Sequence, residues 1–309
     1  MERCLLFCVS CLLAGLPLAA VAQSDPGGYA SGGNTNMPAL TPIVLELQVA
    51  TDSGATQSSQ TLPDVSESTT QDADELAKQL SNPVSSLISV PFQFNYDTPV
   101  GNDGDQLSLT AQPVIPISIS DNWNMISRTL LPLIYQRDVI PGENRSGLGD
   151  VTQTLFFSPK EPGPSGLIWG AGPVFVLPTG ERGLGNKTWG AGASFVVLKQ
   201  IDSWTVGALA NHVVDVGGGR DRVDISSTFL QPFLSKGFSG GRTVSLNSES
   251  TYDWNTHRWT VPINLMFVKV TKIGSQRYSF STGIRGYAQT PGKGPDWGLR
   301  FAVVLLYPK

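Results

Sequence analysis

The sequence is poor in charge and in cysteine. Charged residues make up 15% of the 309 residues, against about 25% in average soluble domains. All three cysteines, Cys4, Cys8 and Cys11, lie in the first 11 residues. With 33 Gly and 22 Pro, the chain does not suit a coiled coil or a long helical bundle. It suits many strands joined by turns, and once the first residues are removed it has no thiol for metal or redox chemistry.

Residues 1–22 have the pattern of a secretory signal peptide. Arg3 precedes an apolar stretch, Pro17 interrupts that stretch, and the small residues Ala20 and Ala22 end it. We therefore expect cleavage after Ala22 and export of the chain. An uncleaved membrane anchor is the alternative, because the apolar stretch is almost long enough to span a bilayer.

Basic residues are absent from the next segment, residues 23–75, which carries eight acidic residues and many Ser, Thr and Gly. Such a composition buries too little apolar surface to offset chain entropy, so residues 23–71 are expected to be disordered. Residues 72–85 are predicted to form a short helix and a segment leading into the folded domain. The stretch has an acidic start and places Leu76 and Leu80 four residues apart. This helix either caps the domain or plugs it.

From residue 86 onward, apolar and polar residues alternate over long stretches. Residues 106–119 alternate over 14 positions, which in one strand extend roughly 45 Å, whereas strands of soluble sheets average about 5–6 residues. Residues 257–268 and 297–307 alternate in the same way. These strands require surroundings thicker than the core of a soluble sheet. Twelve strands are predicted, at about residues 87–96, 106–119, 123–137, 148–158, 166–178, 187–199, 203–215, 225–236, 242–254, 257–271, 276–288 and 297–307.

Short and longer connections alternate between the predicted strands. An even number of antiparallel strands with this alternation is typical of bacterial outer-membrane barrels, in which closure satisfies the backbone amides. The predicted fold class is therefore all-β, a closed antiparallel transmembrane β-barrel over residues 86–309. The short connections are 120–122, 200–202, 239–241 and 272–275, and the longer ones are 97–105, 138–147, 179–186, 216–224 and 289–296.

The ends of the predicted strands support a membrane location. Trp and Tyr residues lie near many of these ends, where they would form interfacial girdles. The last strand, from Asp296 to Val303, looks like the C-terminal assembly signal of outer-membrane barrels, although the chain ends in Tyr307-Pro308-Lys309. The expected partners are therefore outer-membrane lipid and the barrel-assembly machinery.

Prolines inside the predicted strands oppose this interpretation, because proline cannot donate a ladder hydrogen bond. They either mark bulges or indicate a soluble two-sheet sandwich, although a sandwich would leave the charge-free outer faces unexplained. These prolines are Pro113, Pro116, Pro132, Pro173, Pro232 and Pro262.

Four stretches carry a resemblance to a known family: residues 147–151, 204–212, 228–233 and 294–301. They look like proteobacterial outer-membrane proteins that are labelled as transporters, or as similar to an outer-membrane component of the meta-pathway of phenol degradation. The resemblance covers roughly residues 80–309 and not the acidic segment. It implies an outer-membrane barrel of a Gram-negative bacterium with a transport role.

If the apolar faces contact lipid, the opposite faces line a lumen. Ionisable groups at membrane depth are costly unless they face water or pair, so they are candidate functional residues. Arg258 is expected one strand from Glu249. Such charges either fill a narrow barrel as salt bridges or form a constriction that attracts anionic solutes. The candidates are Arg128, Gln231, Asn247, Glu249, Asp253, Arg258, Asn264, Arg285 and Arg300.

Signals for catalysis and for nucleic-acid binding are weak. The chain has two histidines, no H-E-x-x-H motif and a net charge of −4. His212 with Ser226 or Ser227 is a candidate hydrolase site, but nothing in the spacing requires it. No catalytic residue, metal or cofactor is expected.

We therefore expect a passive channel for small molecules, with aromatic or other hydrophobic compounds as candidate solutes. Twelve strands enclose a narrow interior. One alternative is a closed barrel with a structural or adhesive role, and a second is a membrane-embedded hydrolase.

Overall fold

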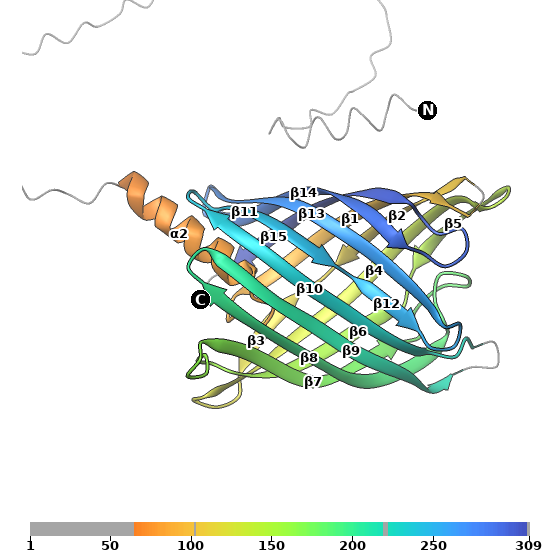
Figure 1. The fold of residues 1–309 in the computed structure, drawn as a ribbon, viewed down its shortest axis with the longest axis horizontal. Helices are drawn as coiled ribbons and strands as arrows, with labels where there is room; N and C mark the ends of the chain where they lie inside the picture. The colour runs from red at the N-terminus through yellow and green to blue at the C-terminus, as the bar shows by residue number, and fades with distance from the viewer. Residues whose placement is uncertain (1–64, 102, 219–221, 308–309) are drawn as a thin grey trace, which may run out of the picture. The chain divides into compact units, whose positions relative to one another are not determined.

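The computed structural model describes residues 65–101, 103–218 and 222–307 (Figure 1). The predicted signal peptide, and the acidic segment as far as residue 64, lie outside the described residues. The described chain contains the helix α2 (Val65–Leu80) and fifteen strand segments. The segments are β1 (Ile88–Val100), β2 (Gly104–Ala111), β3 (Val114–Ser118), β4 (Trp123–Ile140), β5 (Glu143–Leu148), β6 (Val151–Pro159), β7 (Leu167–Leu177), β8 (Thr188–Ile201), β9 (Trp204–Gly218), β10 (Ser226–Phe238), β11 (Arg242–Ser248), β12 (Ser250–Asp253), β13 (Arg258–Ile273), β14 (Gln276–Gln289) and β15 (Trp297–Tyr307).

The helix α2 begins at Val65, earlier than the predicted start at residue 72. Its sequence contains neither Gly nor Pro from Val65 to Leu80, so nothing in it stops the helix from extending toward its N-terminus. In the described part of the chain, no helix is long and apolar enough to cross a membrane.

The strands form one closed antiparallel sheet. β1 pairs with β15 from Ile88 opposite Tyr307 to Thr98 opposite Trp297, and β9 pairs with β10. Because the first and last strands pair with each other, the ring in Figure 1 has no free edge. This closure excludes the two-sheet sandwich and confirms the predicted antiparallel barrel.

The fifteen segments amount to the twelve predicted strands, because three strands are interrupted. β2 and β3 keep one register against β4 across Pro113, and β11 and β12 keep one register against β13 across Glu249, which lies opposite Pro262. Proline has no amide hydrogen for the ladder, so the bonding is interrupted while the strand continues. Between β5 and β6, by contrast, the register against β4 shifts by one residue at Gly149 and Asp150, which forms a bulge.

Two connections that were predicted to be long loops are the ends of hairpins. β1 continues to Val100 and β2 begins at Gly104, while β4 continues to Ile140 and β5 begins at Glu143. Residues 143–147 are all polar or Gly, so they show no alternation of apolar and polar residues. This hairpin extends beyond the apolar band of the barrel, where both faces of a strand contact water.

The outward faces of the strands are apolar and the inward faces carry the polar residues. Phe94 is exposed on the outside, whereas its neighbour Asn95 is buried inside, and the same holds for Phe301 and Arg300. Large apolar side chains are exposed around the whole ring, an area far beyond the patches found on soluble proteins. A barrel with such a surface is solvated by lipid. Outward residues include Leu107, Ile117, Leu131, Phe175, Phe195, Val206, Leu234, Leu246, Phe267 and Ile284.

Two successive residues of β1 provide a matched test of this orientation. We expect Phe94→Arg to lower the free energy of unfolding by about 2–4 kcal/mol, because it places a charge against the lipid near the middle of a strand. Gln93→Arg, one residue away, should cost less, because this side chain is only partly buried inside the barrel and does not contact lipid. Urea unfolding of the barrel in lipid vesicles measures both values, and equal losses would contradict the orientation.

The two ends of the barrel differ. At the turn end, where β1 begins and β15 ends, lie the short connections 119–122, 202–203, 239–241 and 274–275 and the longer connection 160–166. At the loop end lie the longer connections 178–187 and 290–296. The helix α2 lies at the turn end, near the end of β15 (Figure 1).

Polar contacts attach α2 to strands on different sides of the turn end. Gln200 Nε2 on β8 donates to the carbonyl of Lys78 (3.0 Å), and Arg277 Nη2 on β14 contacts Asp72 Oδ2 (3.3 Å). The amide of Gly241, in the turn between β10 and β11, donates to the Asp74 carboxylate. These contacts place α2 across the opening of the barrel.

Apolar contacts continue from α2 into the lumen. Leu76 and Ala77 pack against the inward-facing Val270, Val304 and Leu306. Further along the chain, Val84 is buried in a second cluster with inward-facing side chains of β4 to β9. That cluster contains Ile126, Phe156, Val196, Leu198 and Leu209. The half of the lumen next to the turn end is therefore apolar and largely filled.

Candidate channel constriction

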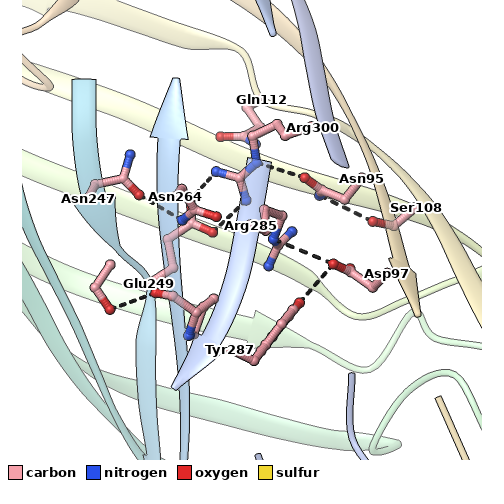
Figure 2. Close-up of polar contacts among 12 residues, drawn as sticks. Asn95, Asp97, Ser108, Gln112, Asn247, Glu249, Asn264, Arg285, Tyr287 and Arg300 are labelled. Carbon is pink, nitrogen blue, oxygen red and sulfur yellow. Dashed lines mark hydrogen bonds and ion pairs between the residues drawn. The ribbon is translucent and has the colours of Figure 1, made fainter. Parts of the chain in front are cut away.

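An ion pair on the inner face of the barrel joins residues from strands that are not neighbours in the sheet. Arg300 on β15 donates from Nη1 to Glu249 Oε1 (2.8 Å) and from Nη2 to Glu249 Oε2 (2.7 Å), and its Nε donates to Asn95 Oδ1 (2.7 Å) (Figure 2). Glu249 lies between β11 and β12, so β13 and β14 separate the two residues. The Arg300 side chain is 4% exposed, and each of its three guanidinium nitrogens donates a hydrogen bond. Two-pronged pairs of this kind fix both direction and distance.

A second ion pair lies beside the first. Arg285 Nε on β14 is 3.5 Å from Asp97 Oδ1, and the Tyr287 hydroxyl donates to the same oxygen (2.9 Å). Arg285 also lies over the Tyr287 ring, 5.4 Å from its centroid. A Cβ at Gly298 would come within 2.4 Å of Asp97 Oδ1, so only glycine at that position leaves room for the carboxylate. Asp97 and Tyr287 were missed from the sequence, and Asp97 was assigned to a loop.

Side-chain amides continue this polar wall. Asn264 Nδ2 donates to Asn247 Oδ1 (2.8 Å), and Asn95 Nδ2 donates to Ser108 Oγ (3.3 Å). Asn264 is fully buried, and its Oδ1 has no hydrogen-bond partner among the described residues.

Arg128 faces the same lumen from β4. Its Nη2 donates to Gln112 Oε1 (3.3 Å). Glu249 interacts electrostatically with Arg128 as well as with Arg285 and Arg300. The structure therefore groups Asp97, Arg128, Glu249, Arg285 and Arg300 around one level of the lumen, and we call these five residues the charged cluster.

Three of the nine candidate residues lie apart from this cluster. Gln231 is inward on β10, between Phe229 and Phe233, at the border of the polar and apolar walls. Asp253 and Arg258 lie opposite each other at the loop end, where Arg258 is exposed. Glu249 thus pairs with Arg300 and not with Arg258, the neighbour suggested by the sequence.

The interior at the level of the cluster retains space for water. Glu249 lies inside the barrel, yet its side chain is 23% exposed, and Arg128 is also only partly buried. A cavity of about 460 Å³ adjoins α2 at the turn end and is lined by residues that include Asn82, Val84, Asn124, Ile168 and Arg277. The helix therefore leaves part of the opening free.

Comparison with known proteins supports the fold. No protein-family model and no curated protein matches the sequence. An outer-membrane channel from Pseudomonas putida F1 matches over 72% of this chain and 96% of its own, with a TM-score of 0.58 and 14% sequence identity. The fold is that of an outer-membrane barrel. Two weaker matches, at TM-scores of 0.43 and 0.41, are the β-domain of the Bordetella autotransporter BrkA and the outer-membrane phospholipase of Salmonella typhi; they cover 72% and 78% of this chain and 100% and 98% of their own, at 14% and 11% identity.

The outer-membrane barrel fold indicates which end of the molecule faces the periplasm and which faces the outside. In outer-membrane barrels the short turns face the periplasm and the longer loops face the outside. By this rule the turn end, with α2, corresponds to the periplasmic end, and Asp253 and the exposed Arg258 lie at the extracellular rim.

His212, the histidine of the candidate hydrolase site, does not face the lumen. His212 points outward from β9, where its Nδ1 lies 2.9 Å from Thr228 Oγ1, and Trp254 Nε1 donates to the same oxygen. The hydrogen-bond partner of His212 is thus Thr228, and neither Ser226 nor Ser227. Among the described residues, no group of three His, Cys, Asp or Glu side chains is placed to hold a metal ion.

Proposed function

We propose that this protein is a passive outer-membrane channel for small solutes and that the charged cluster is its selectivity constriction. The observation that carries this proposal is that the side chains of Glu249 and Arg128 are partly accessible to water inside the barrel. A barrel whose charges served only to fill space would bury them completely. Charged rings that face water are the usual means by which pores select ions and polar solutes.

Two likenesses support the proposal. The Pseudomonas protein of similar fold is named as a channel, and four stretches of this sequence resemble the family linked to the meta-pathway of phenol degradation. That family makes aromatic or other hydrophobic compounds candidate solutes. The inward-facing and only partly buried Phe229 and Phe233 suit such solutes.

Ion selectivity tests the constriction. The charged cluster holds three arginines and two acids, so we expect purified wild-type protein in planar bilayers to prefer chloride over potassium. Arg128→Gln should shift the reversal potential in a KCl gradient toward cation preference, because it removes the excess positive charge. Arg258→Gln is the matched control, since Arg258 is exposed at the extracellular rim, and it should leave the reversal potential unchanged.

Two results would count against the proposal. One is the absence of stepwise conductance from protein that migrates faster on gels before boiling, as folded barrels do. The other is an equal effect of the Arg128 and Arg258 variants, which would place the selective region away from the cluster.

A closed barrel with a structural or adhesive role is the second candidate, and the observation in its favour is the filling of the periplasmic half of the lumen. Val84 and five apolar inward side chains form a dry cluster there, and α2 lies across the opening. On this alternative, variants that displace α2 would not conduct either.

The route to the membrane is part of the same proposal. A cleaved signal peptide over residues 1–22 exports the chain, and the barrel-assembly machinery recognises β15. Within β15, Leu299 and Phe301 face outward in the spacing of the assembly signal.

A further inference from the structure

We infer that the lumen contains a binding subsite for a monocarboxylate with an apolar body, in which Arg285 and Arg128 bind the carboxylate. This inference rests on the proposed channel function and names the class of solute. It follows from the unused hydrogen-bonding capacity of two arginines, from the charge of the cluster, and from the apolar side chains beside them.

The first observation is that Arg285 lacks hydrogen bonds. Its side chain is 9% exposed, and its buried Nε has no hydrogen-bond partner in the described structure, only the longer ion-pair contact with Asp97. Its terminal amino groups make no hydrogen bond to any described residue. A buried donor without a partner is costly, by about 1–3 kcal/mol, and native proteins seldom leave one without a reason. Since Nε itself is closed off from the lumen, a bound anion would supply acceptors for the two terminal amino groups.

Arg128 also has unused hydrogen-bond donors, whereas all three guanidinium nitrogens of Arg300 donate hydrogen bonds. Arg128 donates a single bond, at 3.3 Å, to the neutral side chain of Gln112. Arg300 uses Nε and both terminal nitrogens on Asn95 and Glu249. The guanidinium groups that remain available are therefore those of Arg285 and Arg128, and a guanidinium fork matches a carboxylate in shape and charge.

The charge of the cluster specifies a monoanion. Three arginines face two carboxylates, Asp97 and Glu249, and Glu249 interacts electrostatically with all three arginines. One positive charge is thus uncompensated at this level of the lumen. A single carboxylate neutralises it, whereas a dianion would introduce a new unpaired charge in a confined space.

The apolar surface beside the cluster accommodates the rest of the solute. Phe229 and Phe233 face inward from β10 on either side of Gln231, opposite Thr251 and Asn247 of the strand that carries Glu249. Val114 lies opposite Arg128 in the pairing of β3 with β4. These three apolar residues pack on the buried cluster around Val84 and remain only partly buried. A charged patch therefore adjoins an apolar one within the same lumen.

The proposed subsite requires both a carboxylate and an apolar body. Benzoate has both, whereas the control benzamide lacks the charge and the control acetate lacks the apolar body. Benzoate should reduce the KCl current through wild-type protein in planar bilayers at concentrations at which neutral benzamide and the small anion acetate have no effect. Arg285→Gln and Arg128→Gln should each weaken this block by about tenfold or more, the effect of losing one charge-assisted hydrogen bond. Arg285→Lys should weaken it less than Arg285→Gln, and Arg258→Gln should not change it.

Binding is also measured by titration calorimetry of the detergent-solubilised barrel, after fast migration on unboiled gels has shown that each variant is folded. Conductance without selective block by benzoate would overturn the inference and leave the channel proposal intact. Binding of benzoate that depends on Arg285 and Arg128, in a barrel that does not conduct, would overturn the channel proposal and support the inference. Equal binding of benzoate and benzamide would overturn the inference in either case.

Discussion

Replacing Glu249 by Leu is expected to lower the free energy of unfolding by about 3–5 kcal/mol, because the change leaves the buried Arg300 without its counter-ion. Arg300 is 4% exposed, so little water is available to replace the lost carboxylate. The double variant Glu249→Leu with Arg300→Met should recover most of this loss, since it removes both charges and fills the space with apolar atoms. Urea unfolding in lipid vesicles measures the three values.

The ion pair between Arg145 and Glu143 is the control for this experiment. Its side chains are 35% and 52% exposed on the extracellular hairpin, although the contact is short, at 2.6 Å. Glu143→Gln should therefore cost no more than about 1 kcal/mol. If Glu249→Leu cost no more than Glu143→Gln, the lumen at the cluster would be as wet as the surface, and the constriction would be wide.

The strands could be predicted from the sequence because alternation is a local property. A residue such as Asn264 lies between two apolar neighbours, Ile263 and Leu265, and this alone places it on the inward face. The same reasoning predicted twelve strands and closure. It failed at residues 143–147, where the strand has no apolar face to give a signal.

The partners across the lumen could not be predicted in this way. Alternation indicates which face a residue occupies but not which side chain it meets, because that depends on the register and on the closure of the whole ring. Arg300 and Glu249 are 51 residues apart in the chain, and two strands separate them in the sheet. Asp97 lies on the same inward face as Gln93 and Asn95. Extending the predicted strand by one residue beyond Tyr96 would therefore have identified Asp97 as a lumen residue.

The helix α2 bridges the open end of the closed barrel. Gln200 belongs to β8 and Leu306 to β15, and these strands lie six positions apart in the ring of twelve, on opposite sides. α2 accepts a hydrogen bond from Gln200 and shares one apolar cluster with Leu306, so it spans the periplasmic opening. At Gly241 the absence of a side chain lets the helix approach the turn, since a Cβ there would lie 3.0 Å from Ala73 Cβ. The contacts that hold α2 are few, so displacing it would not require unfolding of the barrel.

We therefore expect Leu76→Asp to increase the single-channel conductance several-fold. Leu76 is 6% exposed and packs on the barrel wall, and removing it from water contributes about 1.5–3 kcal/mol to docking, which a buried carboxylate would reverse. Glu75→Ala is the matched control one residue away, because Glu75 is exposed and, among the described residues, its side chain bonds only Gln79 of the same helix. Planar-bilayer recordings measure both variants. An unchanged conductance in Leu76→Asp would mean that the narrowest point lies at the charged cluster and that α2 does not limit the flow.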